Sequence, residues 1–277
     1  MNIRYGCEIT FHVDMPTPTV CLLDLRPERR VDAHEDIPFA TMPMHPVRTD
    51  RDAFGNVMRR FVAQAGETTL KLEGTIRDSG ALDARDEEAT RLSVASLPAE
   101  ALLYLSGSRY CETDKLSQLA WDIFGKTPAD TQLVEDICSF VHENVAFDYA
   151  RARATRTAIE TLQEGVGVCR DFAHLAITLC RALNIPARYV NGYLGDIGIP
   201  PNPDPMDFNA WFEAYLGGRW FTFDARHNTR RIGRLAIAHG RDAADVPMLQ
   251  TFGAHTLKSF AVTTHEIVDV PAEKVSA

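Results

Sequence analysis

Cys169 stands where a nucleophilic thiol is expected. It follows Gly165 and Gly167 and begins an apolar run with helical periodicity, residues 169–185. In the first turn of a helix, free backbone N–H groups and the helix dipole stabilise a thiolate. The glycines allow close approach of the backbone and can leave N–H groups facing a developing oxyanion. The spacing indicates a cysteine nucleophile, and the alternative is a small buried apolar residue, as expected for Cys180.

A predicted hairpin farther along the chain offers a residue that could orient a base. Two alternating runs flank Gly217-Gly218, a pair that favours a two-residue turn. This register places Asn209 diagonally across from Asp224 on one face of the strands. The two positions then relate as a base and its orienting carboxylate, with an amide where an imidazole would act. The alternative is that Asp224 simply begins a turn at 224–228.

Three further residues could contact a substrate. Trp211 and Tyr215 share the predicted face of residue 209 and could line a groove, while Gly167 would present its backbone there. The alternative for the two aromatic side chains is packing against the helical layer.

The elements that must position these residues fall into two regions. Residues 1–95 carry strand signals separated by turns and predict an N-terminal all-β, sandwich-like domain. Residues 96–277 predict helices followed by strands that could share one sheet, so the expected fold class is α+β. The expected helices cover 114–124, 127–145, 157–165 and 169–185, and the expected strands cover 187–196, 208–216, 219–225 and 257–268.

Composition and residue spacing limit the kinds of partner and cofactor that this chain is expected to bind. The net charge of −9 argues against nucleic acid as a bulk partner. No apolar run reaches the roughly 18 residues of a membrane helix, and the N-terminus lacks a signal-peptide core, so a cytoplasmic location without membrane contact is expected. The six cysteines form no CxxC pair, and no H-x-x-x-H or H-x-H spacing occurs. We therefore expect neither a metal nor a cofactor.

Taken together, the two segments resemble the bacterial transglutaminase-like superfamily, a branch of the papain-like cysteine enzymes. The resemblance implies an α+β core behind an N-terminal β domain, with Cys169 as nucleophile and Asp224 as third member of a triad. It also implies hydrolysis or acyl transfer at a peptide or isopeptide amide through a thioester. The matching motifs are Gly165-Val-Gly167-Val-Cys169-Arg170-Asp171-Phe-Ala173-His174, Trp220-Phe-Thr-Phe-Asp224, and Ile-Pro-Ala-Arg-Tyr-Val-Asn-Gly-Tyr-Leu at 185–194.

One position departs from the family pattern. The family's His-Ala-Trp reads Asn209-Ala210-Trp211. An amide can neither take the thiol proton at neutral pH nor protonate a leaving amine, and losing general acid–base assistance costs about 10²–10⁴ in rate. The expected function is therefore an impaired cysteine hydrolase or acyltransferase. The alternatives are a catalytically silent peptide-binding module and an introduced substitution that traps a complex.

The other polar residues admit more than one interpretation. His227 would lie on the opposite strand face from Asp224, unless the loop at 225–229 is distorted. His174 is expected to pack or support the site, and His142 to lie on the surface or at a helix end. The arginine-rich segment 230–246 could shape an anionic cleft, order the loops beyond Asp224, or form a solvated salt-bridged surface.

Overall fold

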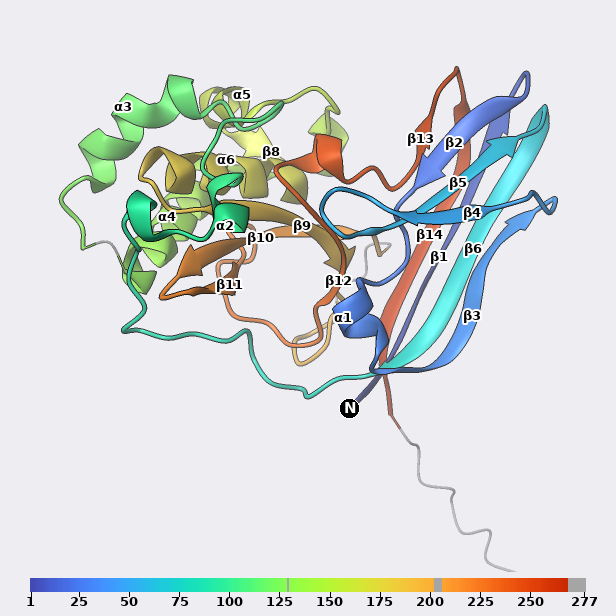
Figure 1. Ribbon diagram of the computed structural model, residues 1–277, viewed down its shortest axis with the longest axis horizontal. Coiled ribbons are helices and arrows are strands. Elements are labelled where there is room, and N and C mark those ends of the chain that lie inside the picture. Colours follow the sequence, from blue (N-terminus) through green and yellow to red (C-terminus); the bar gives the residue numbers. More distant parts are fainter. Residues whose placement is uncertain (129, 202–205, 269–277) are drawn as a thin grey trace, which may run out of the picture.

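A β-sandwich and a mixed helix–sheet layer lie side by side in the computed structural model, which describes residues 1–128, 130–201 and 206–268 (Figure 1). The first sandwich sheet has the strand order β14-β1-β6-β3 and the second β13-β2-β5-β4. Period-2 burial along β1 places its apolar side chains between the sheets. The strands are β1 (Asn2–Val13), β2 (Thr17–Cys21), β3 (Ala33–Met42), β4 (Arg48–Arg51), β5 (Val57–Ala63), β6 (Gly66–Arg77), β13 (Gln250–Thr251) and β14 (Thr256–Ile267).

Two C-terminal strands complete the sandwich, which differs from the predicted division at residue 95. β14 pairs with β1 from Asn2↔Ile267 to His12↔Thr256, and β13 pairs with β2. The predicted strand 257–268 therefore exists but does not join the sheet of the second region. Alternation of apolar residues identifies a strand without identifying its partner, which explains the difference. The predicted end of that region, 269–277, lies outside the described residues.

The second layer is a four-stranded antiparallel sheet covered by helices. Its strand order is β11-β10-β9-β12, and α6 packs against β9 and β10 (Figure 1). This arrangement confirms the α+β class. The elements are α3 (Thr113–Phe124), α4 (Thr131–Asn144), α5 (Ala158–Glu164), α6 (Cys169–Ala182), β9 (Ala187–Tyr193), β10 (Asn209–Leu216), β11 (Arg219–Phe223) and β12 (Leu235–Gly240), with short α1 (Pro27–Arg30), α2 (Ala99–Leu102), β7 (Ala146–Phe147) and β8 (Val166–Gly167).

Two boundaries differ from the sequence prediction. The helix expected from residue 127 begins at Thr131, because the Asp130 side chain caps it by accepting the Leu133 N–H at 3.3 Å. β12 was not predicted, since the segment from Leu235 lacks a clear period and follows several arginines. Within the described ranges, no helix combines the length and apolar character that a membrane crossing requires.

The predicted hairpin register is confirmed. Leu216 pairs with Arg219, and the Gly217-Gly218 turn has φ values of 56° and 89°, the left-handed region that a two-residue hairpin turn requires. The ladder between β10 and β11 ends at Phe212↔Phe223, so the first residues of β10 pair only with β9. This free edge of β10 faces the start of α6.

Candidate active site

Cys169 begins α6 and places its sulfur at the free edge of β10. Its Sγ lies 4.0 Å from the carbonyl oxygen of Phe208, and the Ala210 N–H is directed at it. Cys169 is partly exposed, whereas the other five cysteines are buried. Burial raises the pKa of the Cys169 thiol to about 11, although the Arg226 guanidinium and the Ala210 N–H act to lower it. The thiol is therefore neutral at pH 7 in this arrangement.

Asp171 holds the turn that presents Cys169. Its buried carboxylate accepts the Val168 N–H at 3.0 Å, and it pairs with Arg156 and Arg170, each at 3.1 Å. A carboxylate in the first turn satisfies a free N–H group and complements the helix dipole. The sequence motif contained Asp171, but its spacing alone did not indicate this role.

Gly167 has a steric function next to Cys169. A Cβ atom built on Gly167 would lie 2.7 Å from the Cβ of Asp171, too close for any larger residue without a shift. Gly167 also pairs with Phe147 in the short parallel ladder between β7 and β8. Gly165 ends α5 in the left-handed conformation, with φ of 61°, as predicted for a helix stop. Gly167 thus brings the backbone close to Asp171, and it does not line the cleft described below.

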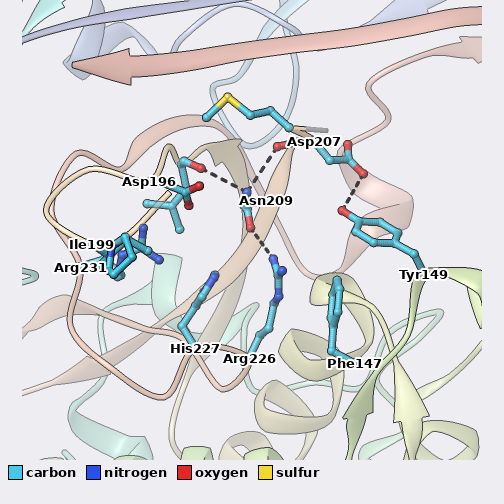
Figure 2. A pocket seen from close by; sticks show the side chains of 12 residues that line it. Phe147, Tyr149, Asp196, Ile199, Asp207, Asn209, Arg226, His227 and Arg231 are labelled. Atoms are coloured by element: carbon cyan, nitrogen blue, oxygen red, sulfur yellow. Dashed lines mark hydrogen bonds between the residues drawn. The ribbon is translucent and has the colours of Figure 1, made fainter. Parts of the chain in front are cut away.

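Asn209 is held at both ends of its amide. Its Oδ1 accepts a hydrogen bond from the Arg226 guanidinium at 2.9 Å, and its Nδ2 donates to the carbonyls of Leu194 and Asp207 at 3.4 and 3.3 Å (Figure 2). The Arg226 guanidinium also stacks on the Phe147 ring, 3.9 Å from its centroid. In the part of the chain that the structure describes, Asn209 makes no hydrogen bond to Asp224.

Asp224 is bound instead by His227, which corrects the predicted pairing. His227 Nδ1 lies 2.8 Å from Asp224 Oδ2, while the backbone N–H groups of Arg226 and His227 donate to Oδ1 at 3.0 and 3.1 Å. The chain makes a helical turn here, closed by the Asn228 N–H on the Asp224 carbonyl at 2.8 Å. The turn carries His227 back to the carboxylate, so the prediction of the opposite strand face was wrong. Asp224 therefore begins a turn and also orients an imidazole.

The arginine-rich segment supports this turn. Arg234 bridges two carboxylates, the buried Asp224 at 2.9 Å and the partly buried Asp83 at 3.0 Å. Burial alone would raise the pKa of Asp224, but Arg234 and the hydrogen bonds from His227 outweigh it and hold this pKa well below its usual range. The ordering role considered for 230–246 thus applies to Arg234.

A cleft of about 220 Å³ lies next to Asn209, Arg226 and His227, and Cys169 and Asp224 are not among its lining residues. Asn209, Arg226 and His227 project into it from β10 and the turn after β11, beside Phe147 and Tyr149 (Figure 2). The Tyr149 hydroxyl donates to Asp207 Oδ2 at 3.0 Å on the far wall. The remaining lining residues are Leu194, Asp196, Ile199, Pro200, Met206, Asp207 and Arg231.

The two aromatic candidates for substrate binding lie elsewhere. Trp211 is 2 % exposed and packs with Val190 and Leu194, with the Arg234 guanidinium 5.0 Å from its ring centroid. Tyr215 packs edge-on against Trp220 near the other end of β10. Neither residue lines the cleft that contains Asn209, and neither belongs to the core beneath α6. Trp211 lines a second cavity of about 400 Å³ with Arg234, and Tyr215 packs beside Ala101 of α2.

Two other histidines, His174 and His142, make contacts that support the fold. His174 is buried between Tyr110 and Tyr189, where its Nε2 accepts the Ala243 N–H at 3.1 Å and burial lowers its pKa well below the usual value. His142, in the last turn of α4, has Nδ1 2.9 Å from the Arg226 carbonyl. In the described part of the chain, no three His, Cys, Asp or Glu side chains group as metal ligands would.

Comparisons with known proteins show which family and fold the chain shares. The transglutaminase-like superfamily model matches residues 117–225. A crystal structure of a "putative cysteine protease" from Cytophaga hutchinsonii is 31 % identical, covers 96 % of this chain and 90 % of its own, and superposes with a TM-score of 0.82. An uncharacterized protein of Mycobacterium tuberculosis is 27 % identical over 224 residues, 73 % of this chain and 70 % of that protein.

A second mycobacterial relative matches over a shorter stretch. An uncharacterized protein of Mycobacterium leprae is 33 % identical over 98 residues, which span about a third of each chain (34 %). The structural match, by contrast, extends over both the sandwich and the helical layer. The chain belongs to the transglutaminase-like superfamily, and the predicted resemblance is confirmed.

Proposed function

We propose that the chain is a transglutaminase-like cysteine hydrolase or acyltransferase acting on a peptide or isopeptide amide through a Cys169 thioester, and that Asn209 makes it slow. Family membership favours an enzyme. The observation that carries the proposal is the placement of Cys169, which is partly exposed at the start of α6 and faces the free edge of β10.

The reaction needs two proton transfers. The sulfur attacks the carbonyl carbon, a C–S bond forms, the C–N bond breaks, and the leaving amine takes a proton. Water or a second amine then attacks the thioester, and the thiol is regenerated. With a thiol pKa of about 11, only about one molecule in 10⁴ carries the thiolate at pH 7, so a base is needed for either step.

Asn209 cannot supply that base. Its Oδ1 accepts from Arg226, and its Nδ2 donates to two backbone carbonyls. A neutral amide neither gains nor loses a proton near pH 7, so it can act neither as a base nor as an acid. The position that the family fills with histidine is thus occupied by a fixed hydrogen-bonding group. Acylation of Cys169 by an ordinary amide substrate is therefore expected to be slow.

The test is Asn209→His, assayed on peptidyl p-nitroanilides with Asn209→Gln as a matched control that keeps the amide. We expect Asn209→His to raise Cys169-dependent turnover about 10²-fold, because it places an acid–base group at the position where the family has one. Asn209→Gln should give no gain, and Cys169→Ala should remove the activity. No increase in Asn209→His, with folding intact by circular dichroism, would contradict the proposal.

That negative result would favour the second candidate, a silent module that binds a peptide. The observation favouring it is the Asn209 amide, fixed at both ends beside an intact cleft. Calorimetric titration with peptides distinguishes the two functions, because a binding module should retain its affinity in Cys169→Ala while showing no turnover in any variant.

A further inference from the structure

We propose that His227, oriented by Asp224, supplies the acid–base assistance behind the slow turnover that remains when residue 209 is an asparagine. The inference rests on the proposed function, because it concerns the proton transfers of the Cys169 thioester reaction. It assigns a catalytic role to a residue outside the family motifs quoted above.

The first argument is the geometry of the imidazole. His227 Nδ1 lies 2.8 Å from Asp224 Oδ2, and an ionised carboxylate accepts hydrogen bonds only, so Nδ1 carries the proton. The Nε2 atom then has a free lone pair and can accept a proton. A carboxylate that fixes the tautomer and direction of an imidazole is the second half of a Cys-His-Asp arrangement.

The second argument is the rigidity of the support. Asp224 Oδ1 accepts the backbone N–H groups of Arg226 and His227, so the carboxylate binds the same turn that carries the imidazole. Arg234 fixes the carboxylate from the other side at 2.9 Å. A base held this way needs little reorganisation when it takes a proton.

The third argument is location. The His227 side chain is 23 % exposed and lines the same cleft as Asn209, to which Arg226, its neighbour in the turn, donates (Figure 2). The Cys169 sulfur lies against the backbone on both sides of Asn209, at Phe208 O and the Ala210 N–H. Cys169 itself does not line the cleft, so an acyl group on its sulfur must extend past Asn209 to reach His227.

The fourth argument is elimination among the described histidines. His227 is the one imidazole among the residues that line the cleft. The buried Nε2 of His174 already accepts the Ala243 N–H. His142 contacts the carbonyl of Arg226 from the surface of α4 and is not among the lining residues.

The proposed proton path balances as follows. In acylation, Nε2 of His227 takes the thiol proton as the C–S bond forms, and gives it to the amine nitrogen as the C–N bond breaks. In deacylation, Nε2 takes a proton from the attacking water or amine as the new bond to carbon forms, and returns it to sulfur as the C–S bond breaks. No oxidant, metal or other reactant enters either step.

The experiment uses p-nitrophenyl acetate as an activated acyl probe on the full chain. The burst of p-nitrophenol reports acylation of Cys169, and the steady-state rate reports deacylation. We expect His227→Ala to lower the steady-state rate about 10²-fold or more, and added imidazole to restore part of it. His142→Ala, the matched control, should leave the rate within about twofold.

The outcomes separate this inference from the proposed function. Cys169-dependent turnover that persists in His227→Ala, or a native burst without turnover, would overturn the role of His227 alone. Absence of any Cys169-dependent burst would overturn the proposed function and with it this step. If His227→Ala unfolds, His227→Asn, which can still donate to Asp224, should fold and show the same loss. Rescue by imidazole excludes a purely structural effect.

Discussion

Two buried aspartates anchor the two halves of the candidate site, and they do so differently. Asp171 lies inside the first turn of α6 and accepts the Val168 N–H together with Arg156 and Arg170. Asp224 follows β11 and binds a turn that contains its own imidazole partner, His227. The half around Cys169, here called the nucleophile side, matches the family pattern residue for residue. The half around Asp224, here called the base side, has Asn209 where the family has histidine, and its histidine, His227, lies outside the family motif. The helix start keeps the family motif, whereas, on our proposal, the turn after β11 determines which group exchanges protons.

The nucleophile side should show the largest loss of stability. Asp171→Asn leaves Arg156, whose side chain is 3 % exposed, without its buried counter-charge. Removing one partner of a buried pair typically costs 3–5 kcal/mol, so we expect a loss of about 3 kcal/mol or more in urea unfolding. Glu164→Gln is the control, because Glu164 contacts the same Arg156 from an exposed position and its loss should be much smaller. Equal effects of the two changes would show that Asp171 is not the anchor.

The base side should show a smaller and pH-dependent loss. Asp224→Asn removes charge-assisted hydrogen bonds to Arg234 and His227, and we expect it to cost about 2–3 kcal/mol at pH 7. Because the pKa of Asp224 is depressed in the folded state, its contribution is fully present above the unfolded value near 3.9 and is lost as pH falls through the folded value. Urea unfolding from pH 7 to 3 should show a constant gap between native and variant that narrows only below about pH 4. A gap that narrows near pH 6 would contradict this assignment.

The same contrast explains how much of the site could be predicted. The start of α6, the stop at Gly165 and the register of the hairpin depend on neighbouring residues, so their sequence signals sufficed. The direction of His227 depends on one turn that reverses the strand, and a continuous strand register gives the opposite answer. Asp224 indicated the turn in part, because an aspartate after a strand commonly accepts the backbone N–H groups of the residues two and three positions later in the chain.

The sequence pattern could not predict which residues pair across long distances in the chain. β14 has the expected alternation, but its pairing with β1 closes a loop that spans almost the whole chain. Arg234 was seen as one of several arginines, and its bridge between Asp83 and Asp224 joins segments that no local pattern connects. Trp211 and Tyr215 share a strand face with Asn209, yet that face is covered along most of its length.

The smallest expected effect concerns Arg226, which connects the two halves. Its guanidinium hydrogen-bonds to Asn209 Oδ1 and lowers the pKa of the Cys169 thiol against the larger opposing effect of burial. Iodoacetamide is neutral, so its reaction rate follows the thiolate fraction, and alkylation of native Cys169 should rise about tenfold per pH unit from pH 7 to 10.

Arg226→Gln should raise the pKa of Cys169 further and slow alkylation at pH 8 by up to about tenfold, the equivalent of one pKa unit. Arg226→Lys, which keeps the charge, should slow it less, and Arg153→Gln, a change at an exposed arginine paired with Glu160 and Glu164, should have no effect. Peptide mass spectrometry would assign the rates to Cys169, the one partly exposed cysteine among the six. An unchanged rate in Arg226→Gln would mean that the base side exerts no electrostatic influence on the nucleophile, and that the two halves act independently.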